Sequence, residues 1–435
     1  MPFRLAFVLA LLAAPAAVAD DWPQWMGPNR DNVWRETGVL EKFPAGGPKV
    51  LWRTPVKGGY AGPAVSGGKV FGSDYTSDTD LGEGNFQRKE ANGTERVFAL
   101  DQATGKPLWE HSYPVRYTIS YPSGPRCTPV VHQGKVYFLG AEGDLLCCDA
   151  ADGKILWKKD LKAEYKTKAA LWGYAAHPLI DGQKLITLAG GDGSHVVALD
   201  KNTGKELWKS QSQPEQGYVP PSIVTVNGVR QLLVVGPSAA RGLDPETGAR
   251  LWTTPYSATN GSIIMTPLVV GEYLYVGGYD GKSLLIKLPA GKTDTVEVVW
   301  KDKPGTAVSP VNVQPFAGGN VVYGMDGPGD MLAVELPSGK RLWSSTAPVA
   351  DGKKVQTGTA FIVKNGDRFV LFNELGEIVF CKLSPTGYEE IDRAKVIEPT
   401  SAAFGRKVVW CMPAFADRKM YVRNDKELIC VDLAR

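Results

Sequence analysis

Residues 99–109 read Ala99-Leu100-Asp101-Gln102-Ala103-Thr104-Gly105-Lys106-Pro107-Leu108-Trp109, and the pattern of this stretch returns along the chain. A small residue opens it, an acidic residue follows two positions later, glycine holds the seventh place and tryptophan the eleventh. The further copies are Cys147…Gly153…Trp157, Ala198…Gly204…Trp208, Gly242…Gly248…Trp252 and, with Glu335 as its acid, Ala333…Gly339…Trp343. An element that returns at intervals of roughly 45 to 50 residues indicates one supersecondary unit, repeated.

Each unit contains four short apolar segments separated by turns rich in glycine and aspartate. In the unit that begins at Thr128, the turn at Gly134 separates the first two segments, and the third segment ends at Asp149. The turn Asp152-Gly153-Lys154 then leads to a fourth segment ending at Trp157. Four short antiparallel strands joined by hairpin turns form the blade of a β-propeller.

Eight such units can be counted from their first strands, which begin near Pro63, Pro129, Pro178, Ser222, Pro267, Pro310, Thr359 and Pro413. The last unit, residues 408–433, has only three strands, whereas residues 48–53 read as an isolated fourth strand. We therefore predict an all-β fold, an eight-bladed β-propeller with four-stranded antiparallel blades. The N-terminal strand would complete the last blade, which removes exposed sheet edges.

The composition is that of an ordinary globular protein. The 435 residues are 43% hydrophobic and 22% charged, and the formal net charge is +3. No block of like charge is present, which argues against nucleic acid or an anionic membrane as the partner. Beyond the N-terminal residues no stretch is apolar enough to span a membrane.

The N-terminus has the pattern of a secretory signal. Arg4 precedes an apolar run, and Ala17-Val18-Ala19 forms a small-x-small cleavage site. We expect a signal peptide at 1–19 with cleavage after Ala19, an N-terminal extension at 20–47 and the propeller at 48–435. The mature protein is expected to be exported, periplasmic or secreted, and no cysteine follows the apolar run to carry a lipid anchor.

The eleven-residue element resembles the tryptophan-docking motif of the quinoprotein alcohol dehydrogenase-like superfamily. This superfamily includes the PQQ-dependent dehydrogenases and the BamB-like proteins, which keep the propeller without the cofactor. The resemblance covers residues 50–434, and residues 21–31 are similar to the opening of exported BamB-like propellers of planctomycete-type bacteria. It implies that each motif tryptophan stacks between the small residue of its own motif and the glycine turn of a neighbouring blade: Trp109, Trp157, Trp208, Trp252 and Trp343.

The residues that would carry chemistry are few. The resemblance draws attention to Cys147-Cys148, because related PQQ dehydrogenases carry a disulfide between adjacent cysteines. Neighbouring side chains of a strand point to opposite faces, so the pair is read here as packing residues. We expect no metal site, since the four histidines lack metal-ligand spacing, and we find neither catalytic residues nor the acids of a calcium-held PQQ site.

Binding is expected on one face of the ring, where the longest connections lie: residues 73–96, 110–126 and 158–176. Aromatic residues and arginine on such connections suggest a recognition surface. The candidate ligand- or partner-binding residues are Tyr121, Arg126, Trp172, Tyr174, His177 and Tyr218.

The favoured interpretation is an exported BamB-like scaffold without catalysis or cofactor. It would assist assembly of envelope proteins or bind an extracytoplasmic protein or small ligand on this face. The alternative is a PQQ-dependent alcohol or sugar dehydrogenase that uses PQQ and calcium, and polysaccharide binding through exposed tyrosine and tryptophan is a third possibility. The sequence leaves the oligomeric state open.

Overall fold

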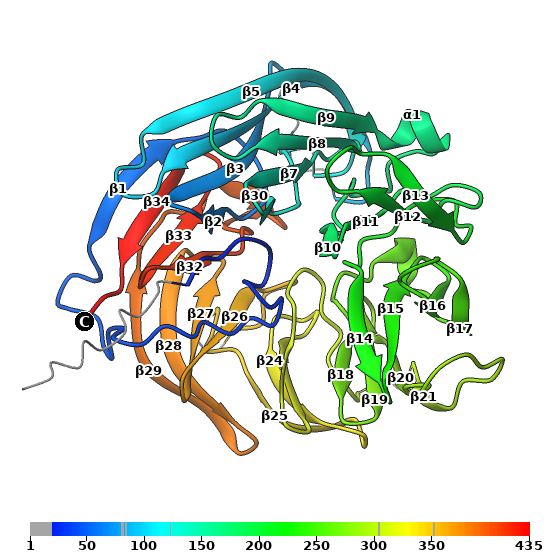
Figure 1. The fold of residues 1–435 in the computed structure, drawn as a ribbon. Helices are drawn as coiled ribbons and strands as arrows, with labels where there is room; N and C mark the ends of the chain where they lie inside the picture. Colours follow the sequence, from blue (N-terminus) through cyan, green and yellow to red (C-terminus); the bar gives the residue numbers. More distant parts are fainter. Residues whose placement is uncertain (1–19, 80–81, 83–84, 122, 303–304, 351–352) are drawn as a thin grey trace, which may run out of the picture.

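The computed structural model describes residues 20–79, 82, 85–121, 123–302, 305–350 and 353–435. Within these ranges the chain forms eight four-stranded sheets and one two-stranded sheet. Figure 1 shows the four-stranded sheets arranged around a common centre. The prediction of an all-β propeller with four-stranded antiparallel blades is confirmed at this level, and the expected signal peptide lies outside the described residues.

Seven of the four-stranded sheets are formed by consecutive strands. The first comprises β2 (Ala64–Ser66), β3 (Lys69–Ser77), β4 (Lys89–Asp101) and β5 (Pro107–Ile119), and the second β6 (Val130–His132), β7 (Lys135–Leu139), β8 (Asp144–Asp149) and β9 (Ile155–Asp160). The third comprises β10 (Leu179–Asp181), β11 (Lys184–Leu188), β12 (Val196–Asp200) and β13 (Glu206–Ser210), and the fourth β14 (Ser222–Val226), β15 (Val229–Val235), β16 (Ala239–Leu243) and β17 (Arg250–Pro255).

The fifth sheet comprises β18 (Leu268–Val270), β19 (Tyr273–Gly278), β20 (Lys282–Lys287) and β21 (Val298–Lys301), and the sixth β22 (Phe316–Gly318), β23 (Val321–Met325), β24 (Met331–Glu335) and β25 (Lys340–Ser345). The seventh comprises β26 (Ala360–Asn365), β27 (Arg368–Asn373), β28 (Glu377–Ser384) and β29 (Gly387–Lys395). A two-stranded sheet of β30 (Ser401–Ala403) and β31 (Arg406–Val408), the helix α1 (Leu161–Tyr165) and the 3-10 turn η1 (Thr259–Gly261) lie in connections.

The eighth sheet joins the two ends of the chain. Its order is β1 (Val50–Pro55), β34 (Glu427–Asp432), β33 (Lys419–Arg423) and β32 (Ala414–Ala416). In β1, Trp52 lies opposite Cys430 and Thr54 opposite Leu428, in antiparallel register. The strand at the N-terminal end thus occupies the outer edge of a sheet whose other strands come from the C-terminal end (Figure 1).

The apolar core lies between neighbouring sheets. One cluster, for example, combines Leu179, Ile186 and Ala198 of the third sheet with Leu232 and Leu243 of the fourth. The inner strands are buried on both faces, so their sequences read as continuous apolar runs. Burial of apolar surface between sheets holds each sheet against the next.

Tryptophans near the outer edges of several sheets connect them to the next sheet. A Cβ at Gly153 would lie 2.5 Å from the indole of Trp109, and a Cβ at Gly204 would lie 2.8 Å from that of Trp157. The φ angles of these glycines are 78° and 71°, a region that other residues rarely adopt. Glycine is therefore needed twice over, for the turn and for contact with the indole, and Gly248 receives Trp208 in the same way.

One motif tryptophan departs from this arrangement, and two tryptophans outside the quoted motifs adopt it. Trp252 donates through Nε1 to the amide oxygen of Gln231 in its own sheet, at 2.6 Å. Trp343 reaches the next sheet, where its Nε1 donates to the carbonyl oxygen of Ser384 at 2.8 Å, as Nε1 of Trp157 does to that of Lys201. Trp52 on β1 lies against Gly105 of the first sheet, and Trp300 lies against Gly339 of the sixth.

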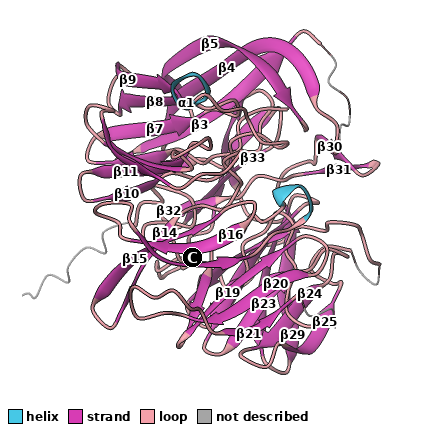
Figure 2. Ribbon diagram, turned by 90° about the vertical axis from the view of Figure 1, so that its right-hand side faces the viewer, coloured by secondary structure: helices cyan, strands magenta, loops and turns pink. Residues whose placement is uncertain are grey.

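The connections of the binding face contain more regular structure than expected. Residues 73–96 were expected as a loop, but β3 and β4 extend into them, and β5 takes up much of 110–126. Figure 2 shows the far ends of β4 and β5 on the same side of the ring as the β30–β31 hairpin. The extension has its own interior, because the buried carboxylate of Glu95 accepts hydrogen bonds from the hydroxyls of Tyr113 and Tyr117.

The first strand of the sixth sheet begins further along the chain than the sequence predicted. It was placed near Pro310, whereas β22 begins at Phe316. Pro310 and Pro315 have no N–H to donate to a strand ladder, which disfavours pairing across this stretch. The residues between them run along the centre of the molecule instead.

Residues 20–36 pack against the inner strands as part of the core. Trp22 exchanges backbone hydrogen bonds with Val65 of β2, each 2.9 Å long, and the N–H of Trp34 donates to the carbonyl of Lys364 in β26 at 2.8 Å. Both indoles are buried, with 2% and 1% exposure. This segment therefore connects the first and seventh sheets, and both indoles also contact Phe415 of the eighth sheet.

Trp52→Ala tests the contact between the eighth and first sheets. Truncation of a buried tryptophan costs about 3–5 kcal/mol of the free energy of unfolding, so we expect a marked fall in the urea midpoint. Leu51→Ala is the matched control on the same strand, because Leu51 is 37% exposed and should change stability by less than about 0.5 kcal/mol. Equal effects of the two substitutions would contradict this role of Trp52.

Candidate functional site

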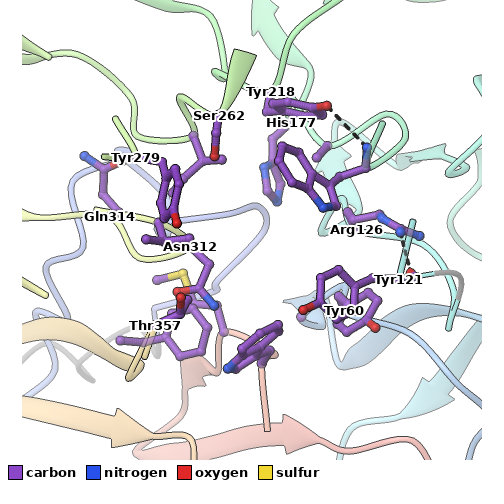
Figure 3. Close-up of a pocket in the computed structure, with 18 of the residues that line it drawn as sticks. Tyr60, Tyr121, Arg126, His177, Tyr218, Ser262, Tyr279, Asn312, Gln314 and Thr357 are labelled. Atoms are coloured by element: carbon purple, nitrogen blue, oxygen red, sulfur yellow. Dashed lines mark hydrogen bonds between the residues drawn. The ribbon is translucent and has the colours of Figure 1, made fainter. Parts of the chain in front are cut away.

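A cavity of about 240 Å³ lies where the sheets converge. Figure 3 shows side chains from several differently coloured parts of the chain pointing toward it. Its lining combines aromatic rings with neutral polar groups, and Arg126 is the one arginine, lysine or carboxylate residue among the described lining residues. Aromatic residues lining it are Trp25, Tyr60, Phe86, Tyr121, Trp172, Tyr218, Tyr279, Phe361, Phe404 and Trp410.

The position of the cavity follows from the repeat. In each unit the chain passes the centre shortly before its innermost strand, and the residues there face the same space. All eight sheets contribute: Tyr60, Thr128, His177, Tyr218, Ile264, Asn312, Thr357 and Trp410. Residues far apart in sequence are thus brought together by one recurring position in the fold.

Five of the six candidate binding residues line this cavity: Tyr121, Arg126, Trp172, His177 and Tyr218. Tyr174 is not among the lining residues. Its ring is buried beneath the surface, and its hydroxyl donates to the carbonyl oxygen of Ala189 at 3.1 Å. Tyr174 therefore packs between the second and third sheets, whereas the sequence interpretation placed it with its neighbours on the binding surface.

Several lining residues were missed by the sequence analysis. Asn312, Thr357 and Trp410 lie in the connections before the inner strands of the sixth, seventh and eighth sheets. Trp25 is a further missed residue. It comes from the segment before β1 and stacks on the His177 ring, with centroids 4.6 Å apart and planes 13° apart.

His177 is held in its neutral form. Burial lowers its pKa well below the usual value, and the nearby positive charge of Arg30 adds to the effect. The guanidinium of Arg30 donates to the carbonyl oxygens of Pro178, at 2.8 Å, and Pro221, at 3.4 Å. Burial also lowers the pKa of Arg30, to about 10. Arg30 thus anchors the N-terminal segment to the third and fourth sheets.

Arg126 contributes positive charge, but backbone groups occupy its donors. Its guanidinium donates to the carbonyl oxygens of Gly124, Ser120 and Tyr121, the last two at 2.9 and 2.5 Å. Its Cζ lies 5.3 Å from the centroid of the Tyr60 ring, which is cation–π distance. The side chain therefore holds the backbone at Ser120, Tyr121 and Gly124 and leaves a single positive charge in the cavity wall.

The cysteines are placed for packing. All six are buried and unpaired in the structure. Cys147 and Cys148 belong to different apolar clusters on the two faces of β8. Burial raises the pKa of each of these two thiols to about 12, so the reactive thiolate is strongly disfavoured at neutral pH.

The lining also does not fit a calcium-held PQQ. Calcium takes oxygen ligands, including carboxylates, and the described lining residues contain no aspartate or glutamate. Across the described part of the chain no cluster of three or more histidine, cysteine or acidic residues is arranged to hold a metal ion. Aromatic rings, one arginine and neutral oxygen donors are present, but the described lining has no carboxylate to balance the charge of the cation.

The recurrent tryptophan–glycine contacts and the central cavity define a β-propeller of the PQQ-like repeat class. Residues 93–345 match the family described as "Outer membrane protein assembly factor BamB". This match covers more than half of the chain, and the chain belongs to that family.

Two kinds of relative share this repeat. The outer membrane protein assembly factor BamB of Shewanella oneidensis is 23% identical over 226 residues, which is 50% of this chain and 56% of that protein. The quinohemoprotein alcohol dehydrogenase ADH-IIG of Pseudomonas putida is 29% identical over 134 residues, 29% of this chain and 18% of that enzyme. The chain thus spans about half the length of this BamB relative and a smaller part of the dehydrogenase.

Solved structures show the same fold. BamB from Moraxella catarrhalis superposes with a TM-score of 0.55 at 17% identity, over 88% of this chain and 97% of that one. Quinohemoprotein alcohol dehydrogenase from Comamonas testosteroni gives a TM-score of 0.59 at 13% identity, over 95% of this chain and 80% of that one. An assembly factor and an enzyme share the architecture, so the lining of the cavity has to distinguish between them.

His177→Gln tests the buried neutral imidazole. The folded-state pKa of His177 lies below its unfolded value near 6.5, so its contribution to stability is complete above pH 6.5 and is lost as the pH falls below it. We expect the wild type to lose up to about 1.4 kcal/mol more per pH unit below 6.5 than the variant. Urea unfolding at pH 7.5 and pH 5 measures the free energy of unfolding of both proteins. The difference between them at pH 7.5, where the imidazole is neutral in both states, gives the packing lost by the substitution and is subtracted from the difference at pH 5. Equal pH dependence in both proteins would contradict the burial of a neutral His177.

Proposed function

We propose that this chain is an exported BamB-like β-propeller that works as a binding scaffold without catalysis. In this proposal the eight four-stranded sheets are eight blades, and β1 closes the ring. The signal pattern at 1–19 supports export, to the periplasm or beyond the cell, with cleavage after Ala19. In the described part of the chain no helix has the length and apolar character needed to cross a membrane.

The central cavity is the observation that carries the proposal. It is concave and mostly aromatic, with a few convergent polar groups, which is the usual character of a ligand site. The described lining contains no acid–base pair and no activated nucleophile. His177 is the lining residue most suited to acid–base catalysis, but burial lowers its pKa and disfavours its protonated form. Such a lining supports recognition and gives no support to a reaction.

The partner class follows from the relatives and from the cavity. BamB relatives are named as assembly factors of outer membrane proteins, which supports an envelope protein as one partner. The cavity supports a small extracytoplasmic ligand as another. Both would approach the face that bears Phe86, Trp172 and Phe404, which line the cavity on the side of the long β4–β5 extension.

The second candidate function is that of a PQQ-dependent dehydrogenase. The quinohemoprotein relatives favour it, and the aromatic cavity lies at the centre of a shared fold. We propose that no PQQ is held, because the lining lacks carboxylate ligands for calcium and its single arginine is engaged with backbone carbonyls. No reaction step is assigned to the chain.

A cofactor titration separates the two candidates. The purified mature protein is titrated with PQQ, with and without calcium, while cofactor absorbance and the thermal midpoint are followed. A ligand that binds only the folded state raises the midpoint. We expect no calcium-dependent rise and no alcohol or sugar oxidation by the PQQ-treated protein. Tight calcium-dependent binding together with substrate oxidation would overturn the scaffold proposal.

A further inference from the structure

Three polar atoms in the cavity wall have no hydrogen-bond partner among the described residues: Nδ1 of His177, Nδ2 of Asn312 and Oγ1 of Thr357. His177 and Thr357 are 9% and 3% exposed. A buried polar group without a partner costs stability, so native proteins satisfy nearly all of them. The residues that carry these atoms line a space that a ligand can enter, and a ligand seated there is one source of the missing bonds.

The bonding needs of these atoms are mixed. The Asn312 amide nitrogen is a donor, whereas the Thr357 hydroxyl and the neutral His177 imidazole nitrogen can each donate or accept, depending on rotamer and tautomer. They come from the third, sixth and seventh units, so they approach the cavity from different directions (Figure 3). A ligand that satisfies all three needs several groups that both donate and accept, spread around its edge. Hydroxyl groups meet this description.

The aromatic residues supply flat apolar faces between these polar groups. Trp172 lies 5.4 Å from Tyr218 and 5.7 Å from Phe86, measured between ring centroids, and Trp410 lies 5.8 Å from Tyr121. Both tryptophans are half-buried, and Phe86 beside Trp172 is 46% exposed. The negative face of an aromatic ring attracts the weakly positive C–H groups of an apolar surface laid against it.

Charge narrows the ligand class further. Arg126 makes the lining weakly positive and disfavours a cation such as a quaternary ammonium group. A ligand with several carboxylates would meet only this one guanidinium, whose donors already bond to Gly124, Ser120 and Tyr121. A neutral ligand is the best match to such a wall.

We propose that the central cavity binds a neutral saccharide of one or two rings, an inference that rests on the proposed binding function. The C–H faces of the sugar ring lie against the aromatic side chains, and its hydroxyls bond to His177, Asn312 and Thr357. The volume of about 240 Å³ falls just below the usual range for drug-sized ligands, which fits a ligand of this size.

Thr357→Val gives the sharpest test, because it removes one hydroxyl and keeps the shape of the side chain. Cellobiose, maltose and N,N′-diacetylchitobiose are titrated calorimetrically into the full mature protein, up to roughly 10 mM. We expect at least one disaccharide to bind, and its affinity to fall about tenfold in the variant, the effect of one lost hydrogen bond. The thermal midpoint without sugar should stay the same or rise, because the removed hydroxyl has no partner in the protein.

Thr187→Val is the matched control. Its hydroxyl is also buried and without a partner among the described residues, but it lies in β11 and does not line the cavity. We expect neither the sugar affinity nor the midpoint to fall. Trp410→Ala is a second cavity variant, in which sugar affinity should fall at least tenfold.

The outcomes separate this inference from the function on which it rests. If none of the three disaccharides binds, and PQQ with calcium does not bind either, the saccharide inference is overturned and the scaffold proposal stands. Failure of the sugars together with calcium-dependent binding of PQQ and substrate oxidation overturns both. Binding of tetramethylammonium chloride in place of the sugars, or sugar binding unchanged by both Thr357→Val and Trp410→Ala, also overturns the inference.

Discussion

The contact between an indole and the glycine turn of the next sheet is the interaction on which the rest of the structure depends. A turn glycine with positive φ has no Cβ, and the tryptophan of the preceding sheet occupies the space that a side chain would fill. Each contact fixes the spacing between two sheets and buries a large aromatic surface. Trp52 extends this arrangement from the eighth sheet to the first through Gly105. Arg423, buried in the same region, donates to the carbonyl oxygens of Ser73 and Lys57 and adds a polar connection.

The cavity is a consequence of that spacing. When sheets are held around a common centre, the segments that precede their inner strands converge, and their side chains line one space. The N-terminal segment contributes as well. Arg30 donates to the carbonyl oxygens of Pro178 and Pro221, which directly precede β10 and β14, and Trp25 stacks on His177. The twelve tryptophans therefore divide by role: Trp22 and Trp34 pack the N-terminal segment onto the sheets, Trp25, Trp172 and Trp410 line the cavity, and the other seven lie at or near the outer strands of the sheets.

The repeat made most of the fold predictable, because turn glycine and docking tryptophan leave a fixed spacing in the sequence. The sixth unit was misplaced where Pro310 and Pro315 interrupt the pairing that the pattern implied. The β4–β5 extension was taken for a loop because its buried acid, Glu95, hides the apolar alternation. At the site, His177 was identified from the long connections of the early units, whereas Thr357 and the other lining residues of the later units were not. Contacts made by residues before β1 leave no periodic signal, and sequence spacing alone did not reveal them.

The central claim is that recognition takes place in the cavity and not on the outer surface of the sheets. Fluorine NMR of protein labelled with 5-fluorotryptophan tests it directly, with each resonance assigned by single substitution and a disaccharide such as cellobiose added. The account predicts shifts for Trp25, Trp172 and Trp410, while the resonances of docking tryptophans such as Trp109 and Trp157 stay in place. Shifts confined to the docking tryptophans, with the cavity resonances unchanged at saturating sugar, would contradict it.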